Sequence, residues 1–454
     1  MATFHWFERL RSLAGWGSEV APPATDRTRE GLVLSGGGSR ASFNIGALRY
    51  LYDVAQISPT KIVGTSSGAI IAAMLAQSLD RAEQSRNLRV LEDYWLAMTG
   101  PEEMFAEQAW FTRLREQWEQ FAPTMPEHDE TEPVLVDANT DDPEGLVLDA
   151  LESDPSTESG DFSLSGVWQM LSMIGRMSRV GPTLAASLRG AGRAASAYRP
   201  GPIVHRLLFE SGFTAQAVAD SGVVLRLAFV GLNSGALRFI RQDGIIVDSE
   251  DRPVSDTPFD LSLGIWASCA IPGVFRPVKL GDEVYVDGGV RESVPIHACV
   301  SNLGVTTPYV VSCLPPGVHE EDFTNKDVIS LMGRSITIMM DETNRDEIAW
   351  ARQMGATVVE PLLDVHGPMD VANPLLHINH DYGWMRAAEE VTGAAPGTTG
   401  AIIEARLALY HILTSQDTPE SEIETVRDQL RTLIANTNPA LLPEGHQSWP
   451  DDSW

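Results

Sequence analysis

A serine flanked by glycines lies where the chain changes from a strand pattern to a helix pattern. The motif consists of Gly64, Thr65, Ser66, Ser67 and Gly68. Residues 61–63 before it predict a buried strand, and the apolar residues 69–76 after it predict a helix. The glycines permit a cramped turn that lifts a serine hydroxyl out of a sheet, and the positive end of the helix dipole points to the same place. The motif therefore predicts an α/β fold with Ser66 as candidate nucleophile.

A glycine-rich loop lies upstream, between a predicted strand at 32–34 and a helix that ends near Val54. The loop residues are Gly36, Gly37, Gly38, Ser39 and Arg40. Consecutive glycines expose backbone N–H groups that can bind an oxyanion or a phosphate, and Arg40 adds a positive charge nearby. The loop is not a Walker A motif, because the lysine and the following Ser/Thr are missing. Two successive strand–helix units also predict a parallel sheet.

A third candidate group, Asp287, follows an apolar strand at 285–286 and precedes Gly288 and Gly289. The glycines release the carboxylate into a turn at the carboxyl edge of the sheet. A carboxylate placed there can accept the proton of a serine hydroxyl without any histidine. Together with the glycine loop and Ser66, this aspartate points to acyl transfer.

In this order, the glycine loop at 36–40, the serine motif at 64–68 and the Asp-Gly-Gly segment at 287–289 resemble the patatin-like phospholipase family. Residues 267–275, which read Ala-Ser-Cys-Ala-Ile-Pro-Gly-Val-Phe, are also typical of that family. The insertion at 99–200 is not covered by the resemblance, and neither is the chain beyond about residue 395.

The resemblance implies a three-layer α/β/α sandwich with a mainly parallel central sheet and a helical insertion. It also implies a Ser–Asp dyad in which Ser66 is the nucleophile and Asp287 its general base. Family members cleave fatty acyl esters of phospholipids or other lipids without calcium, so neither a cofactor nor a metal is expected. The implied supporting residues are Gly36, Gly37, Gly38, Ser39 and Arg40 at the oxyanion hole, Gly64, Thr65, Ser67 and Gly68 at the nucleophile turn, and Gly288 and Gly289 beside the base.

Three other interpretations stay open. An α/β-hydrolase triad also uses a G-x-S-x-G serine, but that fold needs several strands before the serine and only about two are visible here. A general carboxylesterase or lipase, or a non-catalytic lipid-binding protein on the same fold, would carry the same motifs. Among the histidines that lie downstream of Ser66 are His297, His319, His366, His377, His380 and His411, so chain order alone does not exclude a triad. We expect His377 and His380 to cap a helix or to face solvent.

The charge and the cysteines limit the partners and the compartment. Among 454 residues, 62 acidic against 33 basic side chains give a net charge of −29, which repels nucleic acid. The three cysteines have no metal-like spacing and favour reduced thiols. No segment approaches 18 uninterrupted apolar residues, and no signal peptide is visible. We expect a cytoplasmic protein whose substrate is a phospholipid or another fatty acyl ester; the sequence leaves its oligomeric state open.

The chain divides into an N-terminal helix and linker at 1–30, an acyl hydrolase domain at 31–395, and a helical extension with a polar tail at 396–454. Within the domain, the insertion at 99–200 is expected to form a helical cap over the site. Its basic amphipathic part continues to residue 209, and the segment 162–209 either contacts an anionic membrane surface or pairs with the acidic half of the insertion. Candidate walls of an acyl pocket are Trp110, Phe111, Trp118 and Trp168.

Further elements follow from the apolar patterns. Strands are expected at 224–231, 309–313 and 357–360, and helices at 327–353, 384–391, 401–413 and 421–435.

Overall fold

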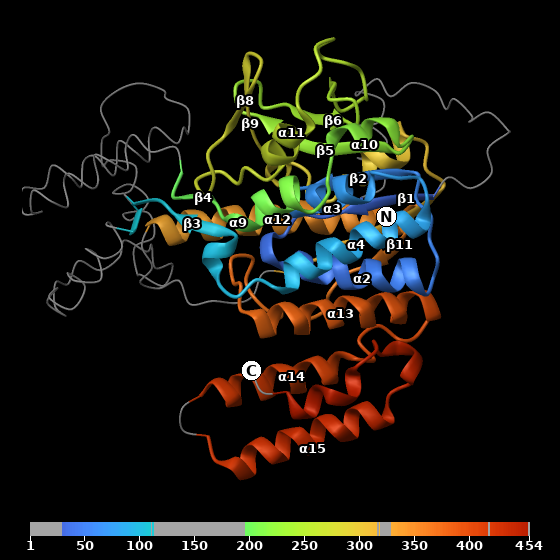
Figure 1. Cartoon of the computed structure of the whole chain (residues 1–454), viewed down its shortest axis with the longest axis vertical. Coiled ribbons are helices and arrows are strands. Elements are labelled where there is room, and N and C mark those ends of the chain that lie inside the picture. Colours follow the sequence, from blue (N-terminus) through green and yellow to red (C-terminus); the bar gives the residue numbers. More distant parts are fainter. Residues whose placement is uncertain are drawn as a thin grey trace, which may run out of the picture.

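The computed structural model describes residues 30–109, 111–112, 196–315, 317, 328–415 and 418–452. A single large sheet organises this part of the chain, with the strand order β11-β10-β1-β2-β5-β6-β7, and β9 and β8 added at β5 (Figure 1). The parallel strands are β1 (Glu30–Leu34), β2 (Lys61–Thr65), β5 (Val224–Gly231), β10 (Thr307–Val311) and β11 (Thr357–Val359).

Antiparallel strands extend one side of this sheet. They are β6 (Leu237–Arg241), β7 (Ile246–Val247), β8 (Val278–Leu280) and β9 (Glu283–Asp287). A separate two-stranded ribbon pairs β3 (Phe105–Glu107) with β4 (Tyr198–Pro200), the two ends of the insertion that the structure describes.

Helices cover both faces of the large sheet. The longer ones are α2 (Ala41–Asp53), α3 (Ser67–Leu75), α4 (Arg81–Leu96), α11 (Leu261–Ser268), α12 (Val328–Gln353), α13 (Asn373–Thr392), α14 (Gly400–Thr414) and α15 (Glu420–Asn436). Shorter ones are α9 (Pro202–His205), which continues as a π-helical turn through Glu210, and α10 (Ala215–Asp220). Figure 1 shows α13 beyond α2, with α14 and α15 stacked beyond α13.

Successive residues of a strand point to opposite faces of the sheet, so alternate residues belong to two separate hydrophobic cores. Leu32 and Ile62 point to one face and pack with α2, α3, α11 and α13, whereas Val33 and Val63 point to the other face. That second core is closed by Ile348 of α12 and its neighbours. The expected three-layer α/β/α sandwich with a mainly parallel sheet is confirmed. Within the described residues, no helix is both long enough and apolar enough to cross a bilayer.

Several boundaries differ from the sequence expectations. β10 lies two residues earlier than expected, and α13 begins at Asn373, well before the apolar pattern near Trp384. The first half of α13 is rich in polar residues that are satisfied by tertiary contacts, so its helical pattern was hidden. α4, α11 and the strands β6–β8 were not anticipated at all. Expectations for residues 1–29 and 113–195 lie outside the described residues.

His377 and His380 both lie inside α13, and His380 is a buried core residue, so the expectation of a helix cap or a solvent-facing pair is wrong. His380 Nε2 lies 2.8 Å from Glu92 Oε1, and its Nδ1 lies 3.5 Å from Asp381 Oδ1. Burial alone would lower the pKa of His380, but hydrogen bonds and charge from Asp381 and Glu92 raise it to about 9. The residue is therefore an ion-paired part of the helix packing.

The residues after α15 fold back onto the helices. Leu441 and Trp449 are buried, and the Arg406 guanidinium lies 4.0 Å from the centre of the Trp449 ring. Arg406 also pairs with Asp381 at 2.6 Å. The end of the chain is thus more firmly packed than the expected polar tail.

Two glycines let the backbones of α2 and α13 approach each other closely. A Cβ at Gly46 of α2 would lie 1.8 Å from the carbonyl oxygen of His380, and a Cβ at Gly383 of α13 would lie 2.0 Å from that of Phe43. Both obstacles are backbone atoms, which cannot rotate away. Because α2 follows the glycine loop, this packing fixes the helix that begins at the candidate site.

We expect Gly383→Ala to destabilise the fold by about 1–3 kcal/mol or more, because the added methyl group forces α2 and α13 apart. The matched control is Gly400→Ala, where the nearest atom to the new Cβ is a Leu363 side-chain carbon at 3.8 Å. Urea unfolding midpoints measure both changes. Equal midpoints for the two variants would show that the α2–α13 approach is not tight.

Candidate active site

Ser66 occupies a strained turn between β2 and α3. Its backbone angles, φ 55° and ψ −128°, lie outside the regions that L-residues ordinarily adopt. Such strain costs on the order of 1–3 kcal/mol and persists only where the surrounding structure holds it. The glycines allow the turn to close, since a Cβ at Gly64 would lie 2.5 Å from the carbonyl oxygen of Gly68. Ser66 therefore sits at the carboxyl edge of the sheet in a conformation that only its neighbours can maintain.

Strand pairing brings Asp287 to Ser66. β2 runs parallel to β5, and its last residue, Thr65, pairs with Ala228. β9 runs antiparallel to β5, and its last residue, Asp287, pairs with Phe229. Because β6 occupies the opposite edge of β5, β2 and β9 share one edge and meet end to end. Two segments far apart in sequence thus finish at adjacent positions of the same strand.

The Asp287 carboxyl group is buried and only partly satisfied. Oδ1 accepts a hydrogen bond of 2.8 Å from the Gly289 N–H, whereas Oδ2 has no hydrogen-bond partner among the described residues. Burial raises the pKa of Asp287 to about 6, against the smaller opposing effects of the Ser66 hydroxyl and the Gly289 N–H. Ser66 is thus near enough to influence the carboxyl group, but the two side chains stop short of a complete hydrogen bond. Catalytic hydrogen bonds are often long before a substrate binds.

The glycine loop that follows β1 passes directly beside Ser66. A Cβ at Gly36 would lie 2.8 Å from the Ser66 Cβ, so the approach requires a glycine. No hydrogen bond within the described residues uses the backbone N–H of Gly37 or Gly38. Gly38 also lines the same pocket as Ser66. These two N–H groups, like that of Gly36, are therefore not engaged in other hydrogen bonds within the described residues.

Ser39 and Arg40 are engaged elsewhere, which narrows the candidate oxyanion hole. The N–H of Ser39 donates to the carbonyl oxygen of Pro368 at 2.9 Å. The N–H of Arg40 donates to the carbonyl oxygen of Gly37 at 3.3 Å, which closes the turn itself. Neither N–H can turn to an anion without breaking these bonds.

The guanidinium of Arg40 ties the glycine loop to a distant segment. It forms an ion pair with Asp364 at 2.5 Å and donates to the carbonyl oxygen of His366 at 2.7 Å. The hydroxyl of Ser39 adds a hydrogen bond of 3.0 Å to the Pro368 carbonyl. The sequence suggests a positive charge beside the oxyanion site, but Asp364 neutralises that charge. Arg40 therefore holds the loop in place and is not part of the pocket lining.

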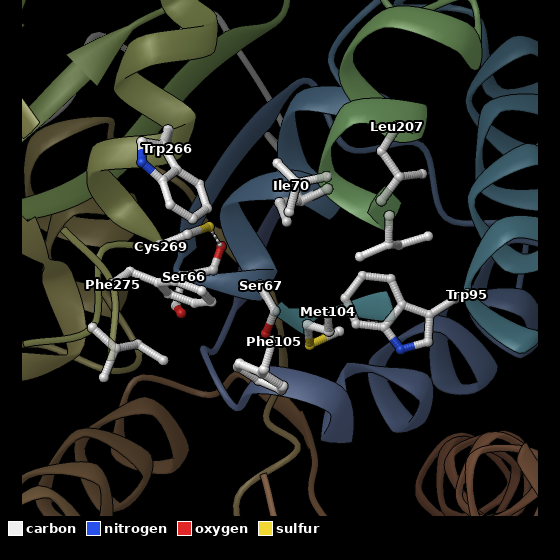
Figure 2. A pocket seen from close by; sticks show the side chains of 14 residues that line it. Ser66, Ser67, Ile70, Trp95, Met104, Phe105, Leu207, Trp266, Cys269 and Phe275 are labelled. Carbon is white, nitrogen blue, oxygen red and sulfur yellow. Dashed lines mark hydrogen bonds between the residues drawn. The ribbon is translucent and has the colours of Figure 1, made fainter. Parts of the chain in front are cut away.

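An apolar pocket opens beside Ser66, and Figure 2 shows its walls. Four of its lining residues are small or polar, namely Gly38, Ser66, Ser67 and Cys269. The others are aliphatic or aromatic: Ile70, Trp95, Met104, Phe105, Ile203, Val204, Leu207, Trp266, Ile271 and Phe275. No charged side chain belongs to this lining within the described part of the chain. A hydrocarbon chain that ends at a reactive carbonyl fits such a slot.

The walls differ from those predicted from the sequence. Phe111 does not line the pocket, because its ring packs against Tyr198, with 5.3 Å between ring centres. The remaining predicted walls lie outside the described residues: Trp110, Trp118 and Trp168.

Most of the observed walls carry no signal in the sequence. Ile70 was open to prediction, since it lies one helical turn after Ser66 on α3. Trp266 and Phe275 adjoin or end the 267–275 motif, which also marks them. The other walls carry no signal of this kind, because their positions depend on how distant segments pack.

No histidine joins Ser66 and Asp287 within the described residues. Besides burial, the groups that influence the pKa of the Asp287 carboxyl group are Ser66 and Gly289, and neither is a histidine. Only β1 and β2 precede Ser66 between residues 30 and 66. These features argue against an α/β-hydrolase triad. The same part of the chain contains no group of three or more His, Cys, Asp or Glu side chains arranged to hold a metal.

We expect Asp364→Ala to lower the turnover number of an ester substrate on the order of 10- to 100-fold, because the glycine loop loses its anchor and the oxyanion donors shift. The Michaelis constant should change little. Asp243→Ala, which breaks the more exposed 2.7 Å pair with Arg241, is the control and should leave turnover unchanged. Wild-type turnover in a folded Asp364→Ala protein would show that Arg40 does not position the loop.

Comparisons with known proteins agree with this geometry. A family model described as patatin-like phospholipase matches residues 32–300 of the 454-residue chain. No curated protein matches the sequence.

Similar solved structures are distant. VipD from Legionella pneumophila is 12% identical with a TM-score of 0.32, and the match covers 94% of this chain and 89% of VipD. Human GIVD cytosolic phospholipase A2 in complex with methyl gamma-linolenyl fluorophosphonate is 12% identical with a TM-score of 0.29, covering 77% of this chain and 46% of that one. The ExoU–SpcU complex of Pseudomonas aeruginosa is 13% identical with a TM-score of 0.24, and the match covers 93% of this chain and 69% of that one. Because the family model spans more than half of the sequence, this chain belongs to the patatin-like phospholipase family and is, in general terms, a lipid acyl hydrolase.

Proposed function

We propose that this protein is a phospholipase A or lysophospholipase that cleaves fatty acyl esters with a Ser66–Asp287 dyad. The observation that carries the proposal is the meeting of β2 and β9 along one edge of β5, which brings Asp287 next to Ser66, a residue that lines an apolar pocket. A nucleophile, a base and a hydrocarbon slot are the parts that acyl transfer from a lipid requires.

In the first half-reaction, Ser66 Oγ attacks the ester carbonyl carbon while Asp287 Oδ2 accepts the hydroxyl proton. The N–H groups of Gly37 and Gly38 and the N-terminal end of α3 stabilise the charge on the carbonyl oxygen. Collapse of the intermediate breaks the bond to the alcohol, which leaves with the proton from Asp287. Water then attacks the acyl ester of Ser66 while Asp287 takes a proton from it; the bond to Ser66 Oγ breaks, Asp287 returns the proton to that oxygen, and the fatty acid is released.

Burial makes Asp287 a suitable base for this sequence of steps. A pKa of about 6 means that the carboxylate is a stronger base than an ordinary aspartate and is still ionised at neutral pH. Among the described residues Oδ2 has no hydrogen-bond partner, so it can take the proton. The hydrogen bond from the Gly289 N–H to Oδ1 helps to orient the carboxyl group.

The pocket supports a long acyl chain over a short one. Burying each methylene contributes about 0.8 kcal/mol, so a chain lying against Ile70, Leu207 and Trp266 gains binding energy with every carbon it places there. A general carboxylesterase would not need this apolar wall. A non-catalytic lipid-binding protein would use the wall but would have no need for a strained serine beside a buried carboxyl group.

Peripheral membrane contact through 162–209 also belongs to the proposal. Residues 196–209 are described; they contribute Ile203, Val204 and Leu207 to the pocket lining. Phe209, two residues after Leu207, is 67% exposed. An exposed aromatic ring close to the pocket walls is compatible with delivery of a substrate from a lipid surface. The rest of this segment lies outside the described residues.

Ser66→Ala and Asp287→Asn are each expected to lower hydrolysis on the order of 10³-fold or more, since one removes the nucleophile and the other the base. Asp282→Asn, an exposed aspartate in the turn before β9, is the matched control and should act as wild type. Rates are measured on phospholipid vesicles and on short soluble esters with all four proteins.

The substrate panel separates the candidate functions. Cleavage of phospholipids by the wild type and not by Ser66→Ala supports the proposal. Cleavage of short esters only would indicate a carboxylesterase, and no cleavage at all would indicate a lipid-binding protein. Full activity of Asp287→Asn would rule out the dyad.

Activity is expected to fall with acid. Asp287 must be ionised to accept the Ser66 proton, so kcat/KM should decline about tenfold per pH unit below the carboxyl pKa of about 6 and level off above it. The measurement is a pH profile with circular dichroism recorded at each pH. A profile that stays flat to pH 4.5 in folded protein would show that no group with this pKa acts as base.

A further inference from the structure

The segment Ser268–Ala270, at the end of α11, contacts the backbone of both members of the proposed dyad. It belongs to the 267–275 motif that the sequence singles out without assigning it a role. Three consecutive residues each make a buried hydrogen bond to the site, and each uses a different group.

Ser268 holds the N–H of Ser66. Its hydroxyl oxygen accepts a hydrogen bond of 3.0 Å from the Ser66 N–H and donates one of 2.6 Å to the carbonyl oxygen of Ala228. Ser268 is fully buried, so no water competes for these bonds. The hydroxyl thus links the strained turn to the strand that both β2 and β9 pair with.

Cys269 holds the carbonyl of the same residue. Its thiol donates to the carbonyl oxygen of Ser66 at 3.2 Å, and Figure 2 shows this bond. Burial and the nearby charge of Asp287 raise the pKa of Cys269 well above its usual range, so the group stays a thiol and keeps its proton. The side chains of Ser268 and Cys269 therefore hydrogen-bond to the backbone N–H and the backbone carbonyl of Ser66, respectively.

The backbone of Ala270 contacts the backbone of Asp287, the proposed base. The Ala270 carbonyl oxygen accepts a hydrogen bond of 3.0 Å from the N–H of Asp287. Because Ser268 and Cys269 bind Ser66 and Ala270 binds Asp287, the short segment 268–270 spans the distance between the two dyad members. A change in this segment would alter that distance directly.

We propose that Ser268 and Cys269 are positioning residues, which keep Ser66 in its strained conformation and fix its distance from Asp287. Neither is a catalytic residue, since their hydrogen bonds are made to backbone groups of Ser66 and not to the reacting hydroxyl. This inference rests on the proposed function, because positioning matters only if Ser66 reacts. A proton transfer between Ser66 and Asp287 is sensitive to small displacements, since a 1 Å misplacement can cost about 100-fold in rate.

The test compares Cys269→Ala, which removes the donor, with Cys269→Ser, which keeps a donor of similar size. The readouts are the second-order rate of Ser66 labelling by a fluorophosphonate, kcat and KM for a phospholipid substrate, and the fraction of protein that is labelled at completion. Ser268→Ala, which removes the acceptor, is measured in the same way. Cys299→Ala is the control, because Cys299 is an equally buried thiol in the core on the other face of the sheet.

We expect Cys269→Ala and Ser268→Ala to lower both the labelling rate and kcat on the order of 10- to 100-fold, with KM changed less than about twofold. Cys269→Ser should stay within about threefold of wild type. Cys299→Ala should lower only the melting temperature. A merely structural role would lower the labelled fraction and the melting temperature but not the rate for each folded molecule.

Two failures are distinguishable. If wild-type Ser66 is not labelled, the proposed function is wrong, and the positioning role that depends on it is wrong as well. If wild-type Ser66 is labelled, and folded Cys269→Ala reacts as fast as wild type, the positioning role is wrong while the proposed function stands. Should Ser268→Ala not fold, the Cys269→Ala and Cys269→Ser pair decides the question alone.

Discussion

The candidate site depends on one edge of one strand. Along that edge of β5, Ala228 pairs with the end of β2 and Phe229 pairs with the end of β9. The carbonyl oxygen of Ala228 also accepts the Ser268 hydroxyl, and a Cβ at Gly288 would lie 2.6 Å from it. Backbone hydrogen bonds between paired strands fix which residues lie opposite each other, up to the last residue of each strand. Ser66 and Asp287 are therefore positioned by the sheet before their side chains interact.

Burial around this edge has chemical consequences. The burial that raises the pKa of Asp287 also strengthens the polar contacts nearby. The strained Ser66 is held there because its backbone N–H and carbonyl are hydrogen-bonded to the side chains of Ser268 and Cys269 at the end of α11. The ion pair between Arg40 and Asp364 holds the glycine loop in place. Stability and reactivity at the site are thus supplied by the same few buried contacts.

The sequence predicts the parts of the site that are local and misses those that are not. Glycine spacing and the change of period reveal the turn at Ser66 and the loop at 36–38, because both are decided within a few residues. Arg40 and Asp364 lie more than three hundred residues apart in the chain, and no pattern in the sequence predicts that they pair. His380 likewise reads as a surface or capping residue until Glu92 is seen beside it. Pocket walls such as Trp95 follow from packing, which a single sequence does not display.

The most direct measurement is the covalent intermediate itself. Wild-type protein and Asp287→Asn are mixed with a long-chain phospholipid, quenched in acid within the first turnover and digested for mass spectrometry. The structure predicts a fatty acyl mass on the peptide that carries Ser66 in the wild type, and none in Asp287→Asn. Phospholipid hydrolysis that proceeds with the acyl group on another residue, or an acylated Ser66 in Asp287→Asn at the wild-type level, would contradict the Ser66–Asp287 dyad.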